Sequence, residues 1–133
     1  MKASELRLGN YIFQQMEMED GKYLPVKVVE ISEDRILFLT EKQQFFLGIR
    51  PFSSIIKQAI PIHLTEDWLL KFGFTLNRNR MQISENFYFE NNKLWVGLPD
   101  GQFRRYIQIS SDRWQYVHQL QNLYFALIGE ELK

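Results

Sequence analysis

The closing stretch YVHQLQNLYFALIGEEL, residues 116–132, decides the fold because its apolar residues recur with the period of a helix. The spacing i, i+1, i+4, i+7, i+8, i+11, i+12 is typical of a helix that packs on a core. We predict this helix over residues 115–128, with Gly129 ending it and Ser111 or Asp112 capping its start. The apolar stripe consists of Tyr116, Val117, Leu120, Leu123, Tyr124, Leu127 and Ile128.

The opposite face of this predicted helix has no charge, since no Lys, Arg, Asp or Glu lies between Arg113 and Glu130. Amides and imidazole can satisfy buried partners without the cost of burying an ion, which is at least several kcal/mol. We therefore predict that this neutral face contacts protein: the N-terminal half of the same chain, a second copy or a foreign partner. The alternative is that it lies in solvent. Its candidate contact residues are His118, Gln119, Asn122 and Phe125.

The segment before the closing helix reads as a three-stranded antiparallel meander on which the helix packs. MQISENFYF turns at ENNK into LWVGL, which turns at PDG into FRRYIQI. A short helix is predicted ahead of it, capped by Thr65, with Glu66 and Asp67 in its first turn and Gly73 just past its end. In this reading Phe74 folds back on Leu69, as in a Schellman motif.

The N-terminal half is rich in strand-forming residues. NYIFQQM, YLPVKVVEI, ILFL and QFFLGI are runs of β-branched and aromatic residues parted by turns, and Pro51 ends the pattern. PFSSIIKQAIP is the expected connector. We predict an α+β protein with a β-rich half over residues 1–60 and a second half over residues 61–133, or both as one compact domain.

Composition excludes several classes of function. The chain has no cysteine, so it has neither a disulfide nor a thiol nucleophile, and its 16 basic and 16 acidic residues cancel. The lack of cysteine fits a reducing cytoplasm, and the apolar runs are too short for a signal peptide or a membrane span, so we expect a cytoplasmic protein. His63 and His118 lie far apart without a neighbouring metal-ligand motif, so we expect no metal, no cofactor and no enzymatic activity.

Basic and aromatic residues are interleaved between Trp68 and Arg113. Arginines beside stacking aromatics on a sheet are a common way to hold single-stranded nucleic acid. The candidate residues for this function are Arg78, Arg80, Trp95, Arg104, Arg105 and Tyr106. The alternative is that the aromatics pack under the closing helix and the arginines are solvated. This segment contains more basic than acidic residues. Seven are basic (Lys71, Arg78, Arg80, Lys93, Arg104, Arg105, Arg113) and four are acidic (Glu85, Glu90, Asp100, Asp112).

Three stretches together resemble a group of small proteins of Bacteroides-type gut bacteria and their prophages: KASELRLGNYI, IPIHLTEDWLLKFGF and the closing stretch. The resemblance implies a cytoplasmic protein of mobile-element origin and carries no functional residue. Separately, LGNYIF and VKVVEISEDRILFL look like the opening of a small SH3-like or KOW-like barrel. Two functions compete: a non-enzymatic protein–protein interaction or accessory role through the neutral helix face, and nucleic-acid binding through the meander or the barrel.

Overall fold

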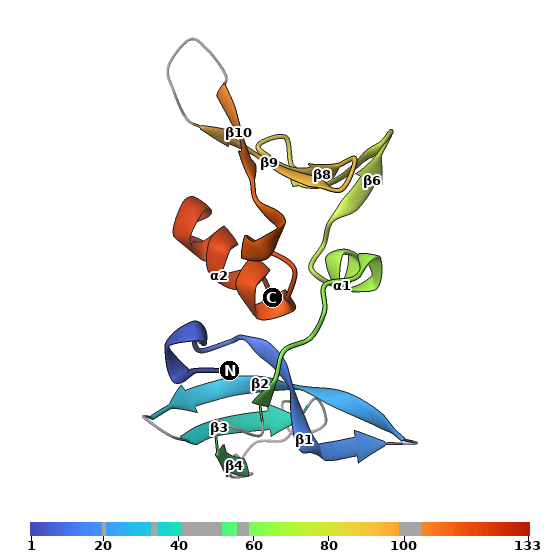
Figure 1. Cartoon of the computed structure of the whole chain (residues 1–133). Helices are drawn as coiled ribbons and strands as arrows, with labels where there is room; N and C mark the ends of the chain where they lie inside the picture. The colour runs from blue at the N-terminus through green and yellow to red at the C-terminus, as the bar shows by residue number, and fades with distance from the viewer. Residues whose placement is uncertain (20, 33–34, 41–51, 56–58, 99–104) are drawn as a thin grey trace. The chain divides into compact units, whose positions relative to one another are not determined.

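The computed structural model divides the chain into two compact units, one of Met1–His63 with Tyr116–Lys133 and one of Leu64–Gln115. It describes residues 1–19, 21–32, 35–40, 52–55, 59–98 and 105–133 (Figure 1). The first unit holds one antiparallel sheet and the closing helix, and the second holds a short helix and another antiparallel sheet. The predicted α+β class is confirmed. The closing helix, expected with the meander half, is grouped with the N-terminal strands.

The first sheet has the strand order β4-β3-β2-β1-β5, with antiparallel neighbours. A barrel requires the two edge strands to pair. Over the described residues the sheet ends at β4 and β5 and does not close, so the SH3-like barrel is not confirmed. Both edge strands come from the segment expected as a connector, and the predicted strand QFFLGI lies outside the described residues. The elements are η1 (Ala3–Glu5), β1 (Tyr11–Glu19), β2 (Lys22–Ile31), β3 (Arg35–Thr40), β4 (Phe52–Ile55) and β5 (Ala59–Ile60).

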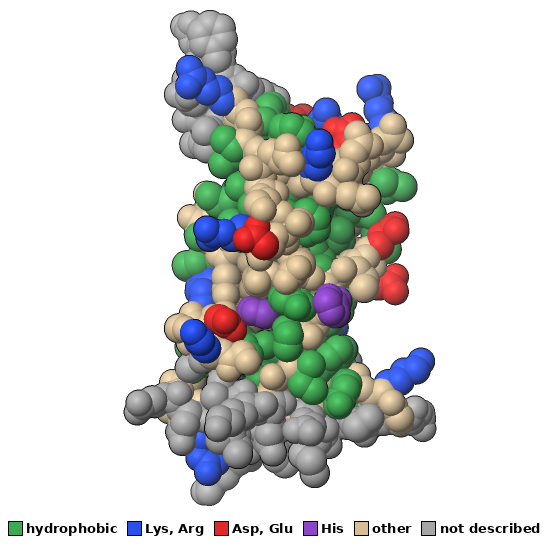
Figure 2. Space-filling model, viewed as in Figure 1, with side chains coloured by type: hydrophobic (Ala, Val, Ile, Leu, Met, Phe, Trp, Pro, Cys, Tyr) green, Lys and Arg blue, Asp and Glu red, His purple; other side chains and the backbone are tan. Residues whose placement is uncertain are grey.

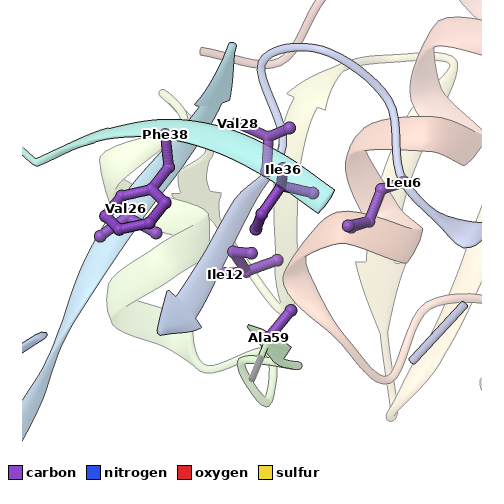
Figure 3. Packing of buried hydrophobic residues seen from close by; sticks show 7 residues of the cluster. All are labelled: Leu6, Ile12, Val26, Val28, Ile36, Phe38 and Ala59. Atoms are coloured by element: carbon purple, nitrogen blue, oxygen red, sulfur yellow. The ribbon is translucent and has the colours of Figure 1, made fainter. Parts of the chain in front are cut away.

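The core of the first unit lies on one face of this sheet. Val26 and Val28 are fully buried while Lys27 between them is half-buried, as alternation along a strand requires. Ile12 from β1 and Ile36 from β3 lie beside them (Figure 3). The buried cluster consists of Leu6, Ile12, Val26, Val28, Ile36, Phe38 and Ala59.

Helix α2 (Val117–Ile128) begins two residues later than predicted. Tyr116 is its N-cap in extended conformation, because it bridges His63 while the Val117 N–H donates to the Ile62 carbonyl (2.8 Å). Gly129 ends the helix in the left-handed region (φ 84°), as predicted. The expected caps Ser111 and Asp112 instead belong to a separate 3-10 turn, η4 (Ser111–Arg113).

Helix α1 (Glu66–Lys71) in the second unit has the ends that the sequence predicts. The Trp68 N–H donates to the Thr65 hydroxyl (3.4 Å). Past the end, Gly73 has φ 93°, its N–H donates to the Leu70 carbonyl, and the Phe74 N–H donates to the Leu69 carbonyl (both 3.0 Å). These two bonds form the Schellman motif. Among the described residues, no helix is long and apolar enough to cross a membrane.

The second sheet is an antiparallel meander in the order β10-β9-β8-β7-β6, with two strands more than expected. MQISENFYF is a hairpin rather than one strand, because Glu85 and Asn86 form a turn in which the Asn86 N–H donates to the Ser84 hydroxyl (3.3 Å). The turn predicted at ENNK is present, and the one at PDG lies outside the described residues. The strands are β6 (Thr75–Asn77), β7 (Arg80–Ser84), β8 (Phe87–Glu90), β9 (Lys93–Leu98) and β10 (Arg105–Ile109).

Candidate functional site

The neutral face of α2 contacts the N-terminal segment of its own unit through Gln121, which is almost fully buried. The Tyr11 N–H donates to Gln121 Oε1 (2.9 Å). Gln121 Nε2 donates to the carbonyls of Gly9 (3.0 Å) and Leu132 (3.1 Å). The amide thus uses both donors and its acceptor without placing a charge in the interior.

Asn122 continues this contact one residue along the helix. Its Oδ1 accepts from Asn10 Nδ2 (3.0 Å), and its Nδ2 donates to the Glu5 carbonyl (2.9 Å). Asn10 is itself buried and accepts from the Arg7 N–H through its own Oδ1 (2.7 Å). A chain of amide hydrogen bonds therefore joins α2 to residues more than a hundred positions away in sequence.

Phe125 lies at the edge of this contact. It keeps 37% of its surface exposed, and the Arg7 guanidinium lies 3.6 Å from its ring centroid. Arg7 Nη2 also pairs with Glu131 (2.9 Å). Gln119 is half-buried and accepts from the Tyr116 N–H (3.2 Å). The sequence left three possible protein contacts for this face: the N-terminal half of the same chain, a second copy and a foreign partner. The structure describes the contact with the N-terminal half.

His118 is the buried imidazole of this face. It is 4% exposed, and its ring stacks on Tyr116 (6.0 Å between centroids, 12° between planes). Its Nδ1 has no hydrogen-bond partner among the described residues. Burial lowers the pKa of His118 below its usual 6.5, while Glu5 raises it and the N-terminal amine lowers it further. The folded state therefore favours the neutral ring.

We expect the stability of the first unit to fall as the pH drops below about 6.5, because the unfolded chain then binds a proton at His118 that the folded chain resists. The measurement is urea unfolding at about pH 7.5 and about pH 5.5 for the wild type, His118→Gln and the control His63→Gln. Only His118→Gln should show a smaller loss of stability at the lower pH. Equal losses in all three proteins would contradict a buried neutral ring.

The second candidate site lies on one face of the meander. Residues directly opposite each other in an antiparallel sheet share a face, and Gln82, Tyr88, Trp95 and Gln108 form such a row across β7, β8, β9 and β10. Arg80 and Tyr106 lie two positions along their strands from this row. The aromatic face, as we call it, consists of Arg80, Gln82, Tyr88, Trp95, Tyr106 and Gln108.

The centre of the aromatic face is Tyr88. The Arg80 guanidinium lies 4.3 Å from the Tyr88 ring centroid, and the Tyr106 ring packs edge-on against it (5.9 Å). Tyr88 is buried beneath these neighbours, whereas Trp95 and Tyr106 are half-buried and Arg80 and Gln108 are exposed. The face thus offers two partly open aromatic surfaces beside a guanidinium.

The structure separates the predicted nucleic-acid residues. Arg80, Trp95 and Tyr106 share the aromatic face. Arg105 pairs with Leu98 and lies on the opposite face, in line with Ile107 and Ile109. Arg78 lies in the β6–β7 turn in the left-handed region (φ 57°), and Arg104 lies outside the described residues. Tyr88, the centre of the face, was not among the predicted site residues.

The electrostatics of the aromatic face are modest. Arg80 Nε pairs with Glu90 Oε2 (3.1 Å), which offsets part of its charge. Figure 2 shows Lys and Arg side chains interspersed with acidic and uncharged ones. Beside Arg80 a polar cavity of about 390 Å³ is lined by Asn77, Arg78, Asn79, Arg80, Gln82 and Glu90. The arrangement suits stacking and hydrogen bonding more than strong charge attraction.

Among the described residues no group of three or more His, Cys, Asp or Glu side chains could hold a metal ion. No protein-family model, curated protein or solved structure matches the chain.

Proposed function

We propose that the second unit binds single-stranded nucleic acid on its aromatic face, as a non-enzymatic accessory protein. The observation that carries this proposal is the gathering of Arg80, Trp95 and Tyr106 on one sheet face around Tyr88. Every base has a π-face, so aromatic side chains on a sheet hold single strands with little regard to sequence. An accessory role in a mobile element would suit such a binder.

The half-buried rings of Trp95 and Tyr106 supply the stacking surface in this proposal. Arg80 supplies a cation for the backbone, and Lys93, whose alternation places it on the same face as Trp95, supplies a second. Because Glu90 pairs with Arg80, we expect a small number of phosphate contacts and a correspondingly weak dependence on salt. The exposed amide of Gln108 and the half-buried amide of Gln82 are suited to base edges.

Protein–protein interaction through α2 is the competing function. Of its candidate residues, Asn122 and Phe125 contact the N-terminal segment of the same unit and His118 is buried, which favours an internal role for them. A foreign partner would have to displace the amide hydrogen bonds of Asn10 and Glu5. The aromatic face needs no such displacement, so we favour nucleic acid.

Trp95→Ala is expected to weaken the binding of a fluorescein-labelled oligothymidine by about 5- to 150-fold, because stacking on one base contributes about 1–3 kcal/mol. The measurement is fluorescence anisotropy at low and at moderate salt. Trp68→Ala is the matched control: Trp68 lies on α1 against Phe72 and Lys71, away from the face. Equal affinity of the two variants, or no binding by the wild type at low salt, would overturn the proposal.

A further inference from the structure

A second cavity of the meander unit lies beside the opposite face of its sheet. It measures about 330 Å³, within the range of small-molecule pockets. Leu76, Met81 and Phe89 form a row across β6, β7 and β8 on that face, so the apolar wall of the cavity lies on the other side of the sheet from the aromatic face. Glu90, opposite Arg80 in the register, is also among the lining residues. Its apolar lining consists of Leu64, Leu69, Leu76, Met81, Phe89 and Trp114.

The aromatic wall of this cavity is held in place before any ligand arrives. The Trp114 indole N–H donates to the Ile109 carbonyl (3.0 Å), which fixes the ring. Phe89 meets that ring edge-on, with 5.1 Å between centroids and 75° between planes. Met81, opposite Phe89 in the sheet, is buried. A ligand would therefore enter a formed surface at little cost in ordering.

The polar lining of the cavity is rich in acceptors and acidic. It consists of Thr65, Glu66, Asn79, Glu90, Asn91 and Asn92, so every charged residue that lines the described cavity is a glutamate. An anionic ligand would meet two carboxylates, and a purely apolar one would leave this lining unused. An ammonium group has three donors for carboxylate and amide oxygens and is attracted to aromatic faces.

We propose that this cavity binds a small organic ammonium compound with an apolar body, of the aryl-alkylamine type. The aryl group lies against Phe89, Trp114 and Met81, and the ammonium group lies at the acidic edge near Glu66. Glu90 also receives Arg80 Nε, which makes Glu66 the carboxylate to test. The apolar wall of the site lies on the other sheet face from the one proposed to bind nucleic acid, and Glu66, on α1, is not part of the aromatic face.

The test is a two-dimensional NMR titration of the full chain with phenethylammonium, which we expect to approach saturation at roughly millimolar concentration. The shifts should centre on Leu69, Met81 and Trp114. 3-Phenylpropionate has the same ring with a negative charge and should bind at least about ten-fold more weakly, since charge repulsion replaces attraction. Equal binding of the two compounds, or no shift at these residues, would overturn the proposal.

Three exposed positions, Glu66, Asp67 and Leu76, allow variants that keep the fold. Glu66→Gln should weaken phenethylammonium binding by about three- to ten-fold, whereas Asp67→Asn, the neighbouring carboxylate outside the lining, should leave it unchanged. Leu76 is 66% exposed, so Leu76→Asn should fold and lose affinity. Equal affinity of the Glu66 and Asp67 variants would refute the assigned carboxylate. Unchanged oligothymidine binding in all three would separate this site from the aromatic face.

Discussion

Gln121→Leu is expected to lower the free energy of unfolding of the first unit by about 3–9 kcal/mol, because each of three backbone groups left without this partner costs about 1–3 kcal/mol. The groups that lose their partner are the Tyr11 N–H and the carbonyls of Gly9 and Leu132. Leucine has a similar volume, so the loss reports hydrogen bonds rather than a cavity.

Urea unfolding followed by far-UV circular dichroism measures this loss. Tryptophan fluorescence would report on the second unit, because all three tryptophans (Trp68, Trp95, Trp114) lie there. Hydrogen exchange of the α2 amides is therefore used to assign the loss of stability to the first unit. Gln121→Glu keeps an acceptor for Tyr11 but loses both donors, and should be destabilised as well. Gln108→Leu, at an exposed glutamine, should stay within about 0.5 kcal/mol of the wild type. A Gln121→Leu protein as stable as Gln108→Leu would show that the amide bonds do not hold α2.

Leu120→Ala should cost about 2–5 kcal/mol of unfolding free energy through lost burial and a residual cavity. Leu120 is fully buried on α2, whereas Leu127, on the same apolar stripe, is 41% exposed. Leu127→Ala is therefore the matched control, with an expected loss of less than about 1 kcal/mol, since much of its surface already meets water. Equal losses for the two leucines would contradict the burial along α2.

The features that the sequence predicted correctly rest on local signals. The Thr65 cap and the turn at Gly73 each involve residues within a few positions of one another, as does the left-handed end of α2 at Gly129. Such motifs are satisfied by neighbouring backbone groups, so their residues can be read without knowing the rest of the fold.

The start of α2 could not be read in this way. Ser111 and Asp112 have the chemistry of N-caps, but the pairing of His63 with Tyr116 keeps Tyr116 extended and delays the helix to Val117. His63, the residue that Tyr116 bridges, lies more than fifty positions away in sequence. A long-range contact here overrides a local preference, which single-sequence reasoning does not detect.

The contact face of α2 was predicted only in outline. The absence of charge pointed to the side of α2 on which Asn122 and Gln121 hydrogen-bond, yet Gln121, with bonds to Tyr11, Gly9 and Leu132, is not among the four candidates. Helical periodicity gives the direction of a side chain but not the position of the backbone groups that it meets. The partners of Gln121 come from both ends of the chain, so only the folded structure brings them together.

Part of the aromatic face could have been predicted from the sequence. Arg105 and Tyr106 are consecutive in a strand, and consecutive strand residues point to opposite faces, so both could not serve one surface. Tyr88 joins Trp95 once the turn at Asn91 and Asn92 sets the register. The position of Arg80 on this face depends on the hairpin turn at Glu85 and Asn86. The sequence pattern predicts one continuous strand there, so it could not place Arg80.

The most direct test of nucleic-acid binding on the aromatic face compares Arg80→Gln with Arg105→Gln. The two variants lose the same charge from opposite faces of one sheet. In anisotropy titrations with oligothymidine, Arg80→Gln should bind about 3- to 10-fold more weakly, and its logarithmic salt slope should fall by about 0.7, the value for one phosphate contact on a single strand. Arg105→Gln should match the wild type in both. Equal losses in the two variants, or a larger loss for Arg105→Gln, would contradict binding on the aromatic face.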